Sequence, residues 1–193
     1  ESTTEITPEL QHSRRAYLKL PLDRKIAIFA GRFVENKGLH EIREIAASLP
    51  DVLFLMCGSG PLDPTNWCLS NVAVLGTKGP TELKDLFLAS DVLLLPSTEG
   101  GFPLVVPEAM ACGLPCCILK DTWLAWGEGA QYFVILERSR MIVQFARYLA
   151  SPMDFAIRRD LARYATASWD WRRSGIDFLE LYRHTKKRHT ASP

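Results

Sequence analysis

The sequence has no dominant charge, no long apolar run and few cysteines. Lysines and arginines number 23 against 22 aspartates and glutamates, a formal net charge of +1. A positive surface for nucleic acid is therefore not indicated, and any recognition of phosphate has to come from a few placed residues. No stretch approaches the roughly 18 apolar residues that a membrane-spanning helix needs. These absences argue against a nucleic-acid partner and against a membrane span.

The cysteines do not form a disulfide or metal pattern. There are five cysteines and four histidines. No two cysteines stand in a C-x-x-C arrangement, and the histidines are scattered along the chain. Such spacing predicts reduced, mostly buried thiols in a cytosolic setting, and it predicts no structural metal.

Four common catalytic or nucleotide-binding motifs are also missing. Neither G-x-G-x-x-G nor G-x-x-x-x-G-K-[ST] occurs, which argues against a dinucleotide fingerprint and against a P-loop. The chain has no Asp-x-Asp pair to hold a metal against a diphosphate. A G-x-S-x-G elbow for a hydrolase nucleophile is absent as well.

What is present is a series of short apolar runs separated by helical patterns. Hydrophobic residues make up 47% of the chain and charged residues 23%, which is ordinary for a globular domain. Near-continuous apolar runs of this length predict strands that are buried on both faces. The six predicted strands are 25–31, 52–58, 72–76, 91–97, 114–119 and 132–136.

Helical periodicity fills the intervals between these strands. Apolar residues recur at helical spacing over 39–49, and a second helix is predicted over 81–90 with Thr81 as its N-terminal cap. Beyond residue 137, three amphipathic helices are predicted over 139–151, 153–168 and 171–187. The alternation predicts a single α/β domain, residues 1–193, with a doubly wound parallel sheet, a core of about 20–150 and C-terminal helices over about 137–186.

The polar residues that could take part in binding or catalysis fall where the predicted strands end. Ligands of open parallel sheets bind outside the carboxyl ends of the strands. The segments there are GRFVENKG (31–38), GSGP (58–61), GTKG (76–79), STEGGFP (97–103) and KDTW (120–123). Arg32 and Lys37 could bind phosphate oxygens near a helix start. They could equally be solvated charges that pair with Glu35.

The stretch GGFPLVVPEA joins a glycine turn to a helix start. Proline is tolerated in the first turn of a helix, so a helix is predicted to start near Leu104 to Val106, with Pro107 in its first turn. Glu108 would then lie in that turn, at the ligand-binding edge. Its carboxylate could accept two hydrogen bonds from the vicinal diol of a ribose. The alternative is that Glu108 only favours the helix dipole.

Five of these segments, in this order, resemble one enzyme family. GRFVENKG, CGSGP, NVAVLG, LFLASDVLLLPS and EGGFPLVVPEAMACGLP are similar to the motifs of the group 1, family 4 retaining glycosyltransferases. The resemblance covers roughly residues 20–119, and the WDWRR…LELY ending also resembles the family's C-terminal helices. It implies the GT-B fold, in which two Rossmann-like domains face each other, and this chain would be the C-terminal, donor-binding half.

The resemblance also implies roles for residues. Arg32 and Lys37 would contact the donor diphosphate and offset the charge of the leaving group, and Glu108 would hold the ribose. Glu99 would be the third catalytic residue, at the sugar. The other donor-binding residues that it implies are Gly31, Gly58, Gly60, Thr77, Lys78, Gly100, Gly101, Phe102, Pro103 and Leu104. Thr77 and Lys78 would lie near the base, and the backbone around Gly101 and Phe102 near the sugar and the phosphates.

Two departures from the family pattern qualify these roles. Eight residues separate Glu99 from Glu108, one more than the family's paired glutamates usually have, so Gly100 stands at the first glutamate in a gapless alignment. DTWLAWGEG replaces the Gly-Gly-Glu that often follows the fifth strand. Contacts to the donor sugar are the part of the site that these changes affect.

The expected function is transfer of a sugar from a nucleoside-diphosphate sugar to an acceptor, without a metal or another cofactor. The partners would be that nucleotide sugar and an N-terminal domain absent from this chain, so the isolated chain would be inactive. The expected location is the cytoplasm, at the inner face of the membrane if the acceptor is a lipid, with peripheral association. Two alternatives stay open: a non-catalytic nucleotide-sugar-binding module, and a GT-B phosphorylase or epimerase.

Overall fold

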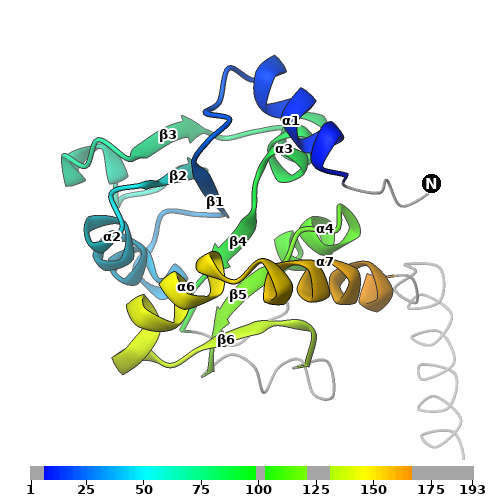
Figure 1. Cartoon of the computed structure of the whole chain (residues 1–193). Helices are drawn as coiled ribbons and strands as arrows, with labels where there is room; N and C mark the ends of the chain where they lie inside the picture. The colour runs from blue at the N-terminus through cyan, green and yellow to red at the C-terminus, as the bar shows by residue number, and fades with distance from the viewer. Residues whose placement is uncertain (1–6, 99–102, 121–130, 167–193) are drawn as a thin grey trace, which may run out of the picture.

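The computed structural model describes residues 7–98, 103–120 and 131–166. Its centre is a six-stranded sheet in the order β3-β2-β1-β4-β5-β6, in which every neighbouring pair is parallel (Figure 1). The strands are β1 (Lys25–Ala30), β2 (Val52–Cys57), β3 (Val72–Gly76), β4 (Val92–Leu95), β5 (Cys116–Leu119) and β6 (Val134–Leu136). This is the doubly wound parallel sheet that the apolar runs predict, and each strand lies within its predicted range, with ends that differ by at most two residues.

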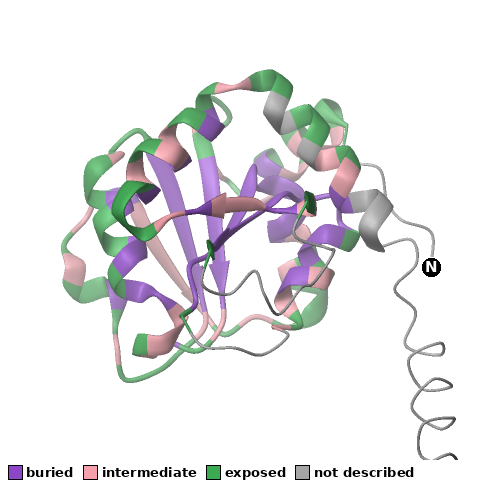
Figure 2. Cartoon of the chain, turned by 90° about the horizontal axis from the view of Figure 1, so that it is seen from below, coloured by how far each residue is buried: buried purple, intermediate pink, exposed green. Residues whose placement is uncertain are grey.

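The strands lie in the middle of the molecule because their side chains are apolar on both faces. Every residue of β2, β4 and β5 is buried, and in β1 only Lys25 is exposed. Figure 2 shows this buried layer between helices whose outer surfaces are exposed. Fully burying one such Leu, Ile or Phe side chain contributes about 1.5–3 kcal/mol. The edge strand β3 is only half-buried.

Helices cover both faces of the sheet. The α-helices are α1 (Pro8–Tyr17), α2 (Leu39–Ser48), α3 (Pro80–Ala89), α4 (Val105–Ala111), α6 (Met141–Ala150) and α7 (Pro152–Thr166). α2 packs against α6, whereas α3 packs against α1 and α4, and α4 packs against α7 (Figure 1). The rings of Phe54 in β2 and Phe145 in α6 lie 6.4 Å apart between their centres, so they join the sheet to that helix layer.

Most predicted helices appear near their predicted bounds, with one wrong cap. α4 begins at Val105 with Pro107 in its first turn, as predicted. α3, however, begins at Pro80, so Thr81 is not its cap. Gly79 occupies the cap position, and the Glu82 carboxylate accepts a hydrogen bond from the Gly79 N–H at 3.0 Å. Proline favours the first helical position because its φ is already helical and it has no N–H to satisfy.

Two further predictions concern the C-terminal helices and the thiols. α6 and α7 confirm the first two of the three predicted C-terminal helices, and 171–187 lies outside the described residues. All five cysteines are free, and all but Cys68 are buried, which confirms the prediction of mostly buried thiols. None of the helices described is both long and apolar enough to span a membrane.

Helix α1 is an element that the sequence pattern does not predict. Its ten residues are mostly polar, and only Arg15 is buried. The Arg15 guanidinium pairs with Asp91 at 2.7 Å and donates to the carbonyl oxygen of Ala89 at 2.8 Å. The helix therefore docks on the protein through the buried Arg15–Asp91 pair and other polar contacts, and Leu10 is its apolar residue packed against the core.

Candidate functional site

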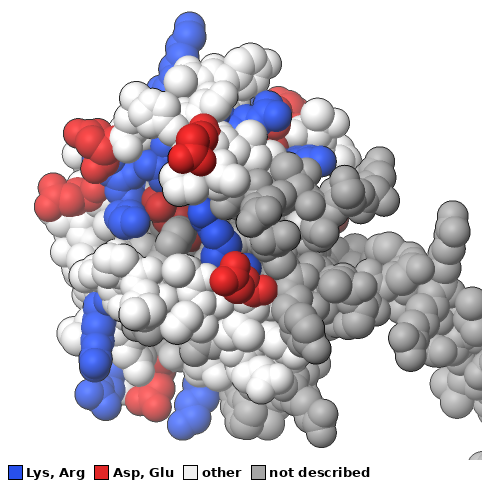
Figure 3. Space-filling view, turned by 45° about the vertical axis from the view of Figure 1, so that its right-hand side comes forward, with Lys and Arg blue, Asp and Glu red and all other residues white. Residues whose placement is uncertain are grey.

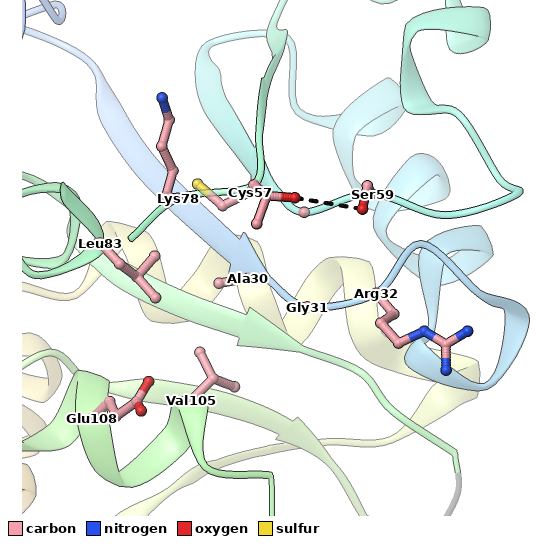
Figure 4. Close-up of a pocket in the computed structure, with 11 residues that line it drawn as sticks. Ala30, Gly31, Arg32, Cys57, Ser59, Lys78, Leu83, Val105 and Glu108 are labelled. Carbon is pink, nitrogen blue, oxygen red and sulfur yellow. Dashed lines mark hydrogen bonds between the residues drawn. The ribbon is translucent and has the colours of Figure 1, made fainter. Parts of the chain in front are cut away.

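A pocket of about 320 Å³ opens at the carboxyl ends of β1 and β2 (Figure 4). The chain after β1 leads to α2 and the chain after β4 leads to α4, on opposite sides of the sheet. The pocket thus lies at the switch point, where open α/β sheets bind their ligands. Its lining residues are Ala30, Gly31, Arg32, Cys57, Gly58, Ser59, Thr77, Lys78, Leu83, Val105 and Glu108.

The floor of the pocket is built from backbone segments in close contact. Gly31 N–H donates to the carbonyl oxygen of Cys57, and Gly58 N–H to that of Gly76, both at 2.9 Å. Gly58 has a φ of +146°, and a Cβ there would collide with the Gly31 carbonyl oxygen. A side chain at Gly58 would therefore push the strand ends apart. Glycine at this position keeps the pocket floor flat and accessible.

Arg32 and Glu108 are the charged side chains that remain available in the pocket. Arg32 follows β1 and lies at one end, whereas Glu108 comes from the first turn of α4, below Ala30 and Gly31 in Figure 4. Among the described residues, neither side chain has a hydrogen bond or an ion pair. Partial burial raises the pKa of the Glu108 carboxyl. Hydrogen-bond donors from a ligand would relieve that cost.

The end of the pocket beyond β3 is held by a small polar cluster. Lys78 Nζ lies 3.4 Å from Glu82 Oε1, and the second Glu82 oxygen accepts from Gly79 N–H. The Gly79 hydrogen bond first, and Lys78 second, lower the pKa of Glu82. Thr77 Oγ1 lies 3.4 Å from Ser59 Oγ. These contacts fix the turn between β3 and α3, and with it the outline of the pocket.

The wall of the pocket is apolar and includes a thiol. Cys57, Leu83 and Val105 come from β2, α3 and α4 respectively. Burial raises the pKa of the Cys57 thiol to about 12. The thiol is therefore neutral at physiological pH, and Cys57 contributes to the wall rather than acting as a nucleophile.

Charges of both signs are interspersed on the surface of the molecule. Figure 3 shows lysines and arginines interspersed with aspartates and glutamates over the face that it presents. No cluster of histidine, cysteine, aspartate and glutamate suited to a metal ion occurs within 7–98, 103–120 and 131–166. Attraction of an anion to this pocket depends on individual side chains, and Arg32 and Lys78 are the cations among its lining residues.

The structure brings six of the residues singled out in the sequence to one pocket. They are Gly31, Arg32, Gly58, Thr77, Lys78 and Glu108. Their presence at one sheet edge follows from the strand-end rule, because they come from four separate loops or helix starts. Their roles stay predictions.

Four other singled-out residues are described but do not line the pocket. Lys37 lies in the short helix η1 (Glu35–Lys37), and Gly60 packs against the backbone of Phe33. Pro103 and Leu104 precede α4, and Leu104 is 51% exposed. Glu99, Gly100, Gly101 and Phe102 lie outside the described residues.

Five lining residues were not predicted as site residues. They are Ala30, Cys57, Ser59, Leu83 and Val105. Four of them are small or apolar, so the sequence pattern assigns them to the core. Ser59 stands inside GSGP, a segment that the strand-end rule does select.

The parallel sheet and a pocket at its switch point define an α/β domain of the Rossmann-like kind. Residues 11–122 match the family model described as glycosyl transferases group 1. The chain therefore belongs to the group 1 glycosyltransferases, which confirms the resemblance inferred from its motifs.

Curated relatives place the similarity within longer proteins. A teichuronic acid biosynthesis glycosyltransferase named TuaC, from Bacillus subtilis strain 168, is 36% identical over 110 residues, which cover 55% of this chain and 28% of TuaC. The D-inositol 3-phosphate glycosyltransferase of Mycobacterium bovis BCG is 28% identical over 195 residues, covering 91% of this chain and 40% of the relative. The chain thus spans less than half the length of either relative.

Solved structures share the fold at low sequence identity. Sucrose-phosphate synthase from Thermosynechococcus elongatus matches with a TM-score of 0.77 at 24% identity, over 91% of this chain and 49% of the other. Anabaena HepE in complex with UDP-glucose matches with a TM-score of 0.69 at 18% identity, over 83% and 48%. The C-terminal domain of LpcC, a group 1 protein from Francisella tularensis, matches with a TM-score of 0.67 at 17% identity, over 85% and 97%. These likenesses confirm the Rossmann-like architecture of GT-B glycosyltransferases.

Proposed function

We propose that this chain is the donor-binding domain of a glycosyltransferase, and that its pocket binds a nucleoside-diphosphate sugar. The observation that carries the proposal is the pocket at the switch point, with Arg32 at one end and the Glu108 carboxylate at the start of α4. A guanidinium binds phosphate oxygens, and a carboxylate accepts hydrogen bonds from a diol. Family membership supports this assignment, as does the similar fold of HepE with bound UDP-glucose.

Each part of the donor has a place in this proposal. Arg32, assisted by Lys37, binds the diphosphate and stabilises the charge that develops on it as the sugar leaves. Glu108 holds the ribose, and the floor formed by Gly31 and Gly58 lets the ligand approach the backbone. Thr77 and Lys78 lie where the base would be bound. Glu99 would act on the sugar and lies outside the described residues.

Transfer itself requires more than this chain in our proposal. The acceptor would bind to an N-terminal domain, and the reaction would retain the configuration of the sugar without a metal ion. The short coverage of the relatives and the 97% coverage of the LpcC C-terminal domain support a domain cut from a two-domain enzyme. We expect the 193-residue chain to bind donor but not to transfer sugar. The longer enzyme would act in the cytoplasm, at the inner membrane face when its acceptor is a lipid.

Thermal unfolding with nucleotides tests the donor site. UDP, GDP and ADP and the corresponding nucleosides are added to the wild-type chain, to Glu108→Gln and to Glu9→Gln. Glu9 is the matched control because it is also a glutamate in the first turn of a helix, α1. At a hundred times Kd, binding adds about 2.7 kcal/mol, which raises the Tm by roughly 5–10 °C for a domain of this size.

The expected result is a shift with one diphosphate in wild type and in Glu9→Gln, and a smaller shift in Glu108→Gln. The nucleoside of the same base should show the same dependence on Glu108, since the ribose is the part held there. Equal shifts in all three proteins would remove Glu108 from the site, and no shift with any nucleotide would contradict the donor pocket. Product analysis of the two-domain enzyme then separates transfer from phosphorolysis, epimerisation and binding without turnover.

A further inference from the structure

One peptide group in the loop between β1 and α2, the group that joins Asn36 to Lys37, is held at both ends. Its N–H, from Lys37, donates to the carbonyl oxygen of Val34 at 3.1 Å. Its carbonyl oxygen, from Asn36, accepts from Ser97 Oγ at 2.9 Å and from Thr98 N–H at 3.0 Å. A carbonyl oxygen has two lone pairs, and a peptide group is planar. Three hydrogen bonds therefore fix the orientation of this group.

The rest of the loop between β1 and α2 is held from two sides. Phe33 N–H donates to the carbonyl oxygen of Ser59 at 2.9 Å, and the Phe33 carbonyl oxygen accepts from Leu62 N–H at 3.1 Å. At the far end, Gly38 has a φ of +76°, and a Cβ there would collide with the Pro96 carbonyl oxygen. The loop lies between the segments that follow β2 and β4, so its Lys37 end is positioned by the residues after β4.

Ser97 is the residue that holds the Asn36–Lys37 peptide group through its side chain. Thr98 donates through its backbone, so a substitution there leaves the bond in place, whereas the Ser97 bond depends on a hydroxyl. Because Ser97 is only 4% exposed, water has little access to the position of its hydroxyl. Losing it would leave one lone pair of a carbonyl without a donor and allow the peptide group to tilt.

We infer that Ser97 is a positioning residue for diphosphate binding, because its hydroxyl orients the peptide group from which the Lys37 side chain extends. The inference rests on the proposed function. Lys37 has four rotatable methylene bonds, so the reach of its ammonium depends on where its backbone is held. Arg32 belongs to the same loop, but its neighbour Phe33 is held by Ser59 and Leu62 rather than by Ser97. Ser97 therefore affects the contribution of Lys37 to phosphate binding, and not the binding of the ribose or the base.

Calorimetry on the 193-residue chain tests this role. The dissociation constants of UDP, GDP and ADP and of their nucleosides are measured for wild type, Ser97→Ala and Ser90→Ala. Ser90 is a matched control because its buried hydroxyl also donates to a backbone carbonyl, that of Leu86 at 2.7 Å, at the other end of the sheet. We expect Ser97→Ala to lower the diphosphate affinity about three- to tenfold, which is the effect of one lost hydrogen bond. The nucleoside affinity should stay unchanged. Ser90→Ala should change neither affinity.

A double-mutant cycle with Lys37→Met shows whether Ser97 acts through that lysine. If it does, Ser97→Ala has no further effect on the diphosphate once Lys37 is replaced. Equal losses for nucleoside and diphosphate would overturn the inference and indicate a merely structural role. Additive losses in the double variant would overturn it too. If the wild-type chain binds none of the three diphosphates, the proposed function fails and the role of Ser97 with it, a result distinct from the other two.

Discussion

The two edges of the same parallel sheet use their charged residues differently. At the amino ends of β1 and β4, Asp91 accepts from Ile26 N–H at 2.7 Å and pairs with Arg15 at 2.7 Å. Lys25 lies 3.6 Å from the second Asp91 oxygen. Both Arg15 and Asp91 are buried, so this edge uses its charges to hold helix α1 and the strands together.

At the carboxyl edge, two charged side chains of the pocket are left available. Arg32 and Glu108 line the pocket, and within the described ranges their side chains form no hydrogen bond or ion pair. Backbone hydrogen bonds hold the strand ends around the pocket, through Gly31, Gly58 and Asn36. The ion pairs found at this edge, such as Arg138 with the buried Glu41, involve neither Arg32 nor Glu108. The difference shows how one sheet separates stability from binding: a buried ion pair stabilises the amino edge, whereas at the carboxyl edge two charged side chains of the pocket have no partner among the described residues.

Replacing Asp91 should give the largest effect on stability. Asp91→Ala leaves the buried Arg15 guanidinium without its carboxylate, and breaking a buried pair from one side costs about 3–5 kcal/mol. Urea denaturation should show this loss in the free energy of unfolding. The nucleotide affinity of the folded fraction should not change, because the pair lies at the opposite edge from the pocket.

Asp85→Ala is the matched control for Asp91→Ala. Asp85 also pairs with an arginine of α1, Arg14, at 3.2 Å, but that pair is partly exposed. Pairs of this kind contribute about 0–1 kcal/mol. Equal losses for the two variants would mean that the amino edge has no special part in stability, and the contrast between the edges would not hold.

Replacing Arg32 should weaken ligand binding and leave stability nearly unchanged, the opposite of what is expected for Asp91. Arg32→Ala is expected to cost about 1.5–3 kcal/mol of diphosphate binding, or roughly 10- to 150-fold in Kd, the range for hydrogen bonds to charged groups. Because Arg32 is exposed, the free energy of unfolding should stay within about 0.5 kcal/mol of wild type. Calorimetry and urea denaturation of the same sample measure both quantities.

The exposed Arg43 of α2 offers a control of equal charge away from the pocket. Arg43→Ala should leave diphosphate affinity unchanged. A comparable loss in this variant would mean that net charge rather than contact governs binding. An unchanged affinity in Arg32→Ala would remove Arg32 from the site.

The sequence predicted the sheet well because its strands are uniformly apolar and short. Helix α1 was missed for the corresponding reason: Pro8–Tyr17 is mostly polar, and the contact that docks it joins Arg15 to Asp91, far away in the sequence. Local patterns carry no information on such a pair. The wrong cap at Thr81 had a different cause, since both Thr81 and Pro80 are acceptable near a helix start and proline took the first position.

For the candidate site, the strand-end rule found the right edge but not each side chain. Arg32 and Glu108 line the pocket. The sequence singles them out because they are charged residues next to a strand end and a helix start. Cys57 and Val105 were missed because buried apolar residues of a wall look the same in sequence as residues of the core. The hydrogen bond from Ser97 to Asn36 links segments 61 residues apart, which periodicity does not detect.

The smallest expected effect is a change of nucleoside affinity with pH. It tests whether the free carboxylate of the carboxyl edge, that of Glu108, contacts the ligand. Partial burial raises the pKa of Glu108 above its ordinary value of 4.5. Glu108 therefore takes up a proton more readily in the folded protein than in the unfolded chain, and the stability that this contributes is present below the ordinary pKa and lost as the pH rises through the raised one. A ribose diol donates its hydrogen bonds to the ionised form. Binding should accordingly weaken as the pH falls through the raised pKa.

Calorimetry with the nucleoside over a pH series checks this prediction. Since one proton is involved, the affinity of wild type should fall by no more than about tenfold per pH unit, beginning above the ordinary pKa of a glutamate. Glu108→Gln cannot ionise, so its weaker binding should be flat over the same range, while Glu9→Gln should follow wild type. A wild-type profile as flat as that of Glu108→Gln would show that the carboxylate does not contact the ribose. Glu108 would then have to contact a part of the ligand other than the ribose diol.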